Sequence, residues 1–168
     1  EPNEFYFLSQ FLQQGMTFVD IGANIGLYSL FAASLVGKTG HVLAFEPSSR
    51  EFKRLHKHLQ LNPQLSVQEF PLALSNTTGL GILQISDDRY AGHNTFGAFV
   101  YPEVKLKKRE KVRKETLDRV TVRHNLKQID IIKLDIEGAE YAALLGGRST
   151  LEHYHPLLLL ELSDRTLR

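Results

Sequence analysis

Apolar and polar residues follow one another along this 168-residue chain in a pattern that predicts helices and strands in alternation. The opening segment NEFYFLSQFLQQG carries apolar residues at helical spacing, and Gly15 is placed to end that helix. Short apolar runs and longer segments with one apolar face then take turns, with strands expected at 17–22, 41–47 and 67–74 and helices at 25–37 and 48–62. This alternation is typical of a doubly wound, mostly parallel α/β sheet.

The alternation breaks after the third strand. From Ser75 to Val122 we find no strong helical pattern, and GILQIS and ETLDRVTV predict extra strands around the loop DDRYAGHNTFGAF. The alternation of strands and helices then resumes with the strand IDIIKLDIEG, the helix AEYAALLGG and the run PLLLLEL. We therefore expect one domain over residues 1–168, divided into an N-terminal helix (1–15), a first half (16–74), a β-rich insertion (75–123) and a second half (124–168).

The composition of the chain excludes some classes of chemistry but does not indicate a function. Apolar residues make up 42% and charged residues 23% of the chain, which is ordinary for a globular protein, and the net charge of +1 argues for neither nucleic acid nor membrane lipid. The absence of cysteine excludes disulfides, thiolate metal sites and cysteine nucleophiles, and it fits a cytoplasmic setting. No apolar run approaches the roughly 20 residues that span a bilayer.

The segment FVDIGANIGLYSL predicts a ligand site, because it reads as a strand, a glycine turn and a helix. A dinucleotide site would need G-x-G-x-x-G, but the three positions hold Gly22, Asn24 and Leu27. Asp20, at the end of the strand, would also repel a pyrophosphate. S-adenosylmethionine carries an ammonium, a sulfonium and no phosphate, so Asp20 would attract it, directly or through water. The alternative interpretation is a solvated aspartate beside a structural turn.

Glu46 supports the same interpretation. It ends the second strand, roughly 20 residues beyond the glycine turn, where an acid accepts hydrogen bonds from ribose hydroxyls. G-x-N-x-G alone is a weak signal, but Asp20 before it and Glu46-Pro47 after it make the combination specific. A strand-end glutamate with only a structural role is the alternative.

The motifs VDIGANIGLYS, AFEP, ETLDRV and IDIIKLDIEGAEYAALLGG resemble the FkbM family of S-adenosylmethionine-dependent methyltransferases over about residues 15–161. The resemblance implies a Rossmann-like class I methyltransferase fold and O-methylation of a small molecule or sugar. It also implies a set of cofactor contacts, namely Asp20, Gly22, Ala23, Asn24, Gly26, Glu46, Pro47, Ala73 and Leu74. Such folds usually carry two more strands after the one expected in PLLLLEL, so either the chain is a piece that ends before them or the sheet edge is completed elsewhere.

A second group of polar residues lies in IIKLDIEG. Alternation along a strand would put Lys133, Asp135 and Glu137 on one face, where burial is costly unless they pair or bind a ligand. A buried Lys133–Asp135 ion pair, with Glu137 capping the next helix, is the structural interpretation. The catalytic one makes Asp135 the base that takes the acceptor proton, or the group that orients the acceptor, with Lys133 lowering its pKa or stabilising the oxyanion. A third uses Asp135, Glu137 and Glu161 as oxygen ligands for Mg²⁺, which we do not favour because no firm third ligand is evident.

Two further segments carry candidate chemistry. His93 or Asn94 in AGHNTFG could contact the acceptor at the rim of the sheet, and a mobile surface loop is the alternative. The basic run KLKKREKVRK could bind RNA phosphates, but it lacks interleaved aromatic residues, and a solvated edge strand protected by lysines is the favoured interpretation. The other histidines show no metal-ligand spacing.

The leading hypothesis is therefore a methyltransferase with a small-molecule or glycan acceptor and no nucleic-acid or membrane partner. Its alternatives are a non-catalytic module with the same fold, an RNA methyltransferase and a nicotinamide-dependent oxidoreductase.

Overall fold

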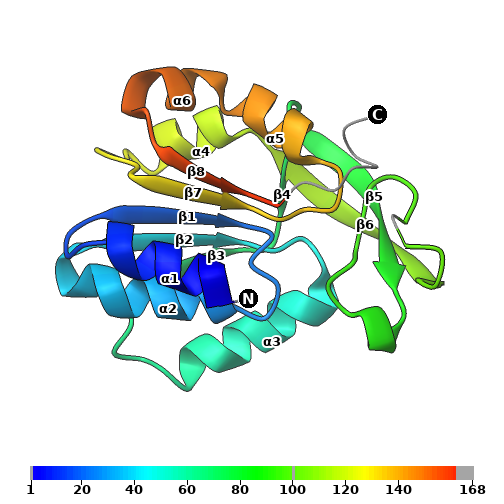
Figure 1. The fold of residues 1–168 in the computed structure, drawn as a ribbon. Coiled ribbons are helices and arrows are strands. Elements are labelled where there is room, and N and C mark those ends of the chain that lie inside the picture. The colour runs from blue at the N-terminus through cyan, green and yellow to red at the C-terminus, as the bar shows by residue number, and fades with distance from the viewer. Residues whose placement is uncertain (1, 100, 162–168) are drawn as a thin grey trace.

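The computed structural model describes residues 2–99 and 101–161, which form a central parallel sheet with helices on both faces (Figure 1). The sheet has the strand order β3-β2-β1-β7-β8. Its strands are β1 (Thr17–Ile21), β2 (His41–Phe45), β3 (Val67–Phe70), β7 (Ile131–Leu134) and β8 (Leu157–Leu160). The predicted doubly wound α/β fold is confirmed.

The order of the strands reverses at β1. The chain builds outward from β1 to β2 and β3, then returns to the other side of β1 with β7, which pairs Asp20 with Lys133 and Ile21 with Leu134. In open parallel sheets ligands bind beyond the carboxyl ends of the strands at such a reversal. The fold therefore brings the glycine turn after β1 and residues 135–138 (DIEG, called the DIEG segment below) after β7 together at the carboxyl edge of the sheet.

The two faces of the sheet are covered by different helices. One face packs against α1 (Pro2–Phe11) and α2 (Leu27–Val36), and α3 (Ser49–Gln60) lies on the same side (Figure 1). The other face packs against α4 (Leu117–Arg123) and α5 (Glu140–Gly146), with α6 (Arg148–Tyr154) beside them. Alternate strand residues supply the two cores: Phe18 and Ile131 face α2, while Val19 and Ile132 face α4 and α5.

A second sheet of three strands stands beside the carboxyl edge of the first. It has the order β4-β6-β5 and is built from β4 (Ala73–Leu74), β5 (Gly79–Ser86) and β6 (Leu106–Glu115), with β5 and β6 antiparallel. Short 3-10 turns at Gly37–Thr39 and Asp88–Tyr90 complete the elements of the described residues. The segment 87–99, called the lid loop below, connects β5 to the residues that lead into β6.

Three sequence predictions are corrected at this level. The run 67–74 is two strands in different sheets, because Pro71 breaks the ladder between β3 and β4. The segment 115–122 is mostly helix α4, whose start Thr116 caps by accepting the Arg119 N–H. The first helix ends at Phe11 rather than Gly15. The basic run forms most of β6, and because β4 pairs only with Lys114 and Glu115, the rest of the run has one unpaired edge, as the edge-strand interpretation expected.

Candidate active site

A cleft opens where β1 and β7 end, between the main sheet and the lid loop. Most of its wall comes from the ends of β1 and β2, from the residues that follow β1, β2 and β7, and from β4 with the residue before it. A residue of β5 and the lid loop close the cleft. The lining residues are Ile21, Gly22, Asn24, Phe45, Glu46, Pro47, Leu72, Ala73, Leu74, Leu83, Gly92, Asn94, Phe96, Asp135, Ile136 and Ala139. The cleft leaves a free volume of about 50 Å³, below that of typical small-molecule sites, and a ligand the size of a nucleoside would need the lid loop to shift.

Packing of the neighbouring segments against the turn requires glycine at these positions, in addition to the close approach of a ligand that the sequence suggested. Gly22 has φ +85°, and a Cβ there would lie 2.0 Å from the Asp135 carbonyl oxygen. Gly26 has φ +90°, and its Cβ would meet the Leu55 side chain at 2.5 Å. Each glycine therefore lets a neighbouring segment approach the turn, the DIEG segment in one case and α3 in the other. Ala23, between them, packs against Leu55 and does not line the cleft.

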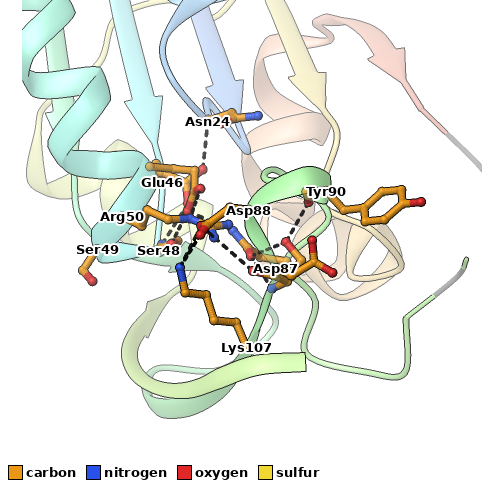
Figure 2. Close-up of polar contacts among 12 residues, drawn as sticks. Asn24, Glu46, Ser48, Ser49, Arg50, Asp87, Asp88, Tyr90 and Lys107 are labelled. Carbon is orange, nitrogen blue, oxygen red and sulfur yellow. Dashed lines mark hydrogen bonds and ion pairs between the residues drawn. The ribbon is translucent and has the colours of Figure 1, made fainter. Parts of the chain in front are cut away.

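Glu46 fixes the turn to the end of β2. One carboxylate oxygen accepts the Asn24 N–H at 2.9 Å and the other accepts the Ser48 N–H at 2.8 Å, as Figure 2 shows. Burial raises the pKa of Glu46 to about 8, even though both backbone donors favour its ionised form. Each carboxylate oxygen retains a lone pair, so Glu46 can still accept hydrogen bonds from a ligand in the cleft.

Asp20 lies beneath the turn and does not line the cleft. Its Oδ2 accepts a hydrogen bond from Ser29 Oγ at 2.5 Å, and its buried Oδ1 has no hydrogen-bond partner. Burial raises the pKa of Asp20, and the charge of Lys133 opposes that rise. Contact between Asp20 and a ligand, as the sequence suggested, therefore remains an expectation that this geometry does not favour.

Lys133 is a buried cation between two carboxylates. Its Nζ donates to Asp135 Oδ2 at 3.1 Å and lies 4.6 Å from the centre of the Tyr28 ring. Burial alone would lower the pKa of Lys133, but Asp20 and Asp135 outweigh it and raise that pKa. The expected Lys133–Asp135 pair is present. Asp135 lines the cleft with 34% of its side chain exposed, and Lys133 does not reach it.

Glu137 does not share the face of Lys133 and Asp135, because β7 ends at Leu134 and Glu137 itself has φ +50°. It also does not cap the next helix: the Glu140 carboxylate accepts the Ile136 and Gly138 N–H groups instead. Glu137 turns to the lid loop, where its Oε1 lies 2.5 Å from His93 Nδ1. The Thr95 hydroxyl donates to the Glu137 carbonyl oxygen at 2.9 Å. His93 and Glu137 therefore hold the lid loop to the end of β7, beside the cleft lining rather than in it.

The lid loop is also tied to α3. The Asn94 side chain donates to the buried Glu51 carboxylate at 3.1 Å and accepts the Ser86 N–H at 3.1 Å. Arg50 reaches Asp88 at the base of the loop, and Lys107 of β6 pairs with the same carboxylate (Figure 2). The loop thus spans from α3 to the end of β7 and closes the cleft between them.

Among the residues that the structure describes, no three His, Cys, Asp or Glu side chains converge as metal ligands, so Asp135, Glu137 and Glu161 form no such group.

Sequence reasoning missed several residues that shape the cleft. Phe96 and Leu83 supply an apolar wall from the small sheet and the lid, which no local motif could reveal. Glu51 could have been found, because Ser48-x-x-Glu51 matches a capping-box pattern. In the structure the Ser48 and Glu51 side chains bond to each other, and Glu46 takes the Ser48 N–H that the capping box would assign to Glu51.

The fold is a Rossmann-like α/β fold whose cleft lies at the switch point between β1 and β7. The Methyltransferase FkbM domain family matches residues 20–166, and the chain belongs to that family. The family resemblance of the sequence motifs is thus confirmed.

Relatives among known proteins agree. The chain is similar to "Methyltransferase sdnD" of Sordaria araneosa, with 31% identity over 153 residues, covering 76% of this chain and 59% of that protein. It is also similar to "AMB antimetabolite synthetase AmbE" of Pseudomonas aeruginosa, with 27% identity over 164 residues, covering 76% of this chain and 7% of that protein. The chain therefore spans little more than half of the first relative and a small part of the second.

A solved SAM dependent methyltransferase from Aquifex aeolicus overlaps 44% of this chain and 43% of its own, with 23% identity and a TM-score of 0.36. Among the described helices, none has the length and apolar character that crossing a membrane requires.

Proposed function

We propose that this chain is an S-adenosylmethionine-dependent methyltransferase that acts on a hydroxyl of a small molecule or sugar. The observation that carries the proposal is the charge of the cleft. Its lining residues include two carboxylic acids, Glu46 and Asp135, and no Lys, Arg or His. Asp135, together with Glu46 where it is ionised, would attract a cationic group and repel a diphosphate, and no cation in the lining would offset that repulsion. Membership of the methyltransferase family supports the same cofactor.

The residues of the cleft fit the parts of S-adenosylmethionine. Glu46 would accept hydrogen bonds from the ribose hydroxyls. Asn24 and Gly22, in the glycine turn, would contact the ligand. Ala73, Leu74 and Phe96 form an apolar wall that suits the adenine, with Pro47 at the edge. When bound, the cofactor supplies a methyl group already activated by the sulfonium.

The chain must then orient the acceptor and accept its proton. Asp135 is placed for that role because it lines the cleft, is partly exposed and is held by Lys133. Lys133 stays charged and fixes the Asp135 carboxylate as a hydrogen-bond acceptor. His93, held by Glu137, lies at the neighbouring rim, where it would contact the acceptor. In this scheme Asp135 would take the hydroxyl proton, and the bound cofactor would supply the methyl group, with its carbon–sulfur bond breaking as the oxygen–carbon bond forms and S-adenosylhomocysteine leaving.

Calorimetry and a methyl-transfer assay test the proposal together. S-adenosylhomocysteine should bind, and at pH 9, where Glu46 is ionised, Glu46→Gln should weaken that binding about 10- to 100-fold, as loss of hydrogen bonds to a charged group implies. Label from methyl-labelled S-adenosylmethionine should reach hydroxyl compounds in an extract. Binding without any transfer would indicate the non-catalytic module, and transfer only into RNA would replace the proposed acceptor class.

A further inference from the structure

The basic strand β6 carries an open edge that the proposed reaction does not use. β5 pairs with β6 along its length, but on the opposite side β4 pairs only with Lys114 and Glu115. Among the described residues no strand pairs with 106–113 on that side. The Glu115 carbonyl points toward β4, because it accepts the Ser75 N–H at 2.9 Å. Strand alternation therefore directs the main-chain N–H and C=O groups of Arg109, Lys111 and Arg113 to the open edge.

A groove of about 270 Å³ runs along this edge, between β6 and the start of α3. Pro47, Phe52, Pro71 and Val112 give it an apolar floor, while Lys53, Lys111 and Arg113 are exposed along its rim. Its lining includes one acid, Glu110, which accepts the Ser49 N–H at 3.1 Å and lies 3.4 Å from Lys108 Nζ. The charge of Glu110 is thus already offset, and the rim is cationic.

We propose that this groove binds an acidic, extended segment of a partner protein, which adds as a strand to the open edge of β6. Added strands gain their affinity from main-chain hydrogen bonds and their specificity from alternate side chains. Here the same residues, Arg109, Lys111 and Arg113, offer both the main-chain groups and the cationic side chains. Acidic side chains on the added strand meet these cations, and apolar ones pack on the floor.

A nucleic acid fits the groove less well. Phosphates accept hydrogen bonds from N–H groups but are repelled by carbonyl oxygens, and a strand edge presents both in equal number. A peptide backbone uses both. The groove floor also offers a single aromatic residue, Phe52, which is half-buried and leaves little surface for base stacking.

Two substitutions of one residue separate the main-chain bond from the charge. Lys111→Ala removes the cation and keeps the N–H, whereas Lys111→Pro removes both. Proline is tolerated where a strand N–H faces an open edge, so the β5 ladder should persist. Circular dichroism and thermal unfolding of both variants check that it does.

The binding probe is a fluorescein-labelled peptide, acetyl-(Glu-Val)₅-amide, followed by fluorescence anisotropy at low salt. Controls are acetyl-(Lys-Val)₅-amide and a uridine decamer of RNA. We expect the acidic peptide to bind at least tenfold more tightly than either control, and Lys111→Pro to weaken it at least tenfold beyond Lys111→Ala. NMR of the wild-type protein should show slowed exchange of the Arg109, Lys111 and Arg113 amides when the peptide is added.

Equal binding by the two variants, no protection of those amides, no binding at millimolar peptide or tighter binding of the RNA would each overturn the proposal. The measurements use no methyl donor, so their outcome is independent of the proposed activity.

Discussion

Glu46 gives the most quantitative test of the cofactor site. Its pKa of about 8 places the change in its charge within the range of ordinary assays. The ionised carboxylate accepts hydrogen bonds from two ribose hydroxyls, whereas the protonated acid carries a donor that competes for one of these positions. We therefore expect the affinity for S-adenosylhomocysteine to rise with pH, and the Glu46→Gln variant to lose that dependence.

The size of the effect follows from the pKa. With a pKa of about 8, roughly one tenth of Glu46 is ionised at pH 7 and roughly nine tenths at pH 9, so the binding constant should rise about ninefold, or about 1.3 kcal/mol. Stability should move in the opposite direction. Because folding raises this pKa from 4.5, the folded state binds more protons between pH 4.5 and 8, and the free energy of unfolding should fall across that window.

Calorimetric titrations at pH 7, 8 and 9 would measure the affinity, and thermal unfolding at the same values would measure stability. Glu152→Gln provides a matched control, because Glu152 is exposed and pairs only on the surface with Arg148. An affinity for S-adenosylhomocysteine that stays flat with pH in the wild type, or that rises equally in Glu46→Gln, would refute the assigned role.

Three further predictions concern the turn, the base and the lid. Gly22→Ala should lower the free energy of unfolding by about 2 kcal/mol or more, because the added Cβ would clash with the Asp135 carbonyl oxygen. Gly79→Ala is the control, because Gly79 is also at positive φ but has no neighbour within 4 Å. Denaturant unfolding should show a smaller loss of stability for Gly79→Ala than for Gly22→Ala. Asp135→Asn should reduce turnover by about 100-fold or more while S-adenosylhomocysteine affinity changes less than about twofold, and parallel loss of both would count against it as the base. His93→Ala should lower turnover in kinetic assays without weakening cofactor binding, so equal loss of turnover and affinity would contradict its placement on the acceptor side.

Local patterns predicted the central strands β1, β2 and β7 well because nearly all of their residues are buried, and they predicted α3 well because Phe52, Leu55 and Leu59 give it an apolar stripe. β1, β2, α2 and α3 fall where the pattern placed them. The insertion was harder, since ETLDRVTV has β-branched residues that favour a strand, yet packing of Leu117 and Val120 against the core makes it a helix. The run 67–74 was misread because strand periodicity cannot reveal that two adjacent segments belong to different sheets.

For the site, the sequence predicted the residues that lie next to a motif. Gly22, Asn24, Glu46, Pro47, Ala73, Leu74 and Asp135 all line the cleft. It could not place Asp20, because a carboxylate at the end of a strand can point into the cleft or beneath it. The His93–Glu137 contact joins residues 44 positions apart, and only the path of the lid loop brings them together.

The central claim is that the cleft favours a nucleoside that carries an ammonium group and no phosphate over a diphosphate. Competition calorimetry with S-adenosylhomocysteine and NAD on the unmodified chain tests it most directly. We expect heat of binding from S-adenosylhomocysteine and none from NAD at millimolar concentration. Tight binding of NAD, with no response to S-adenosylhomocysteine, would contradict it.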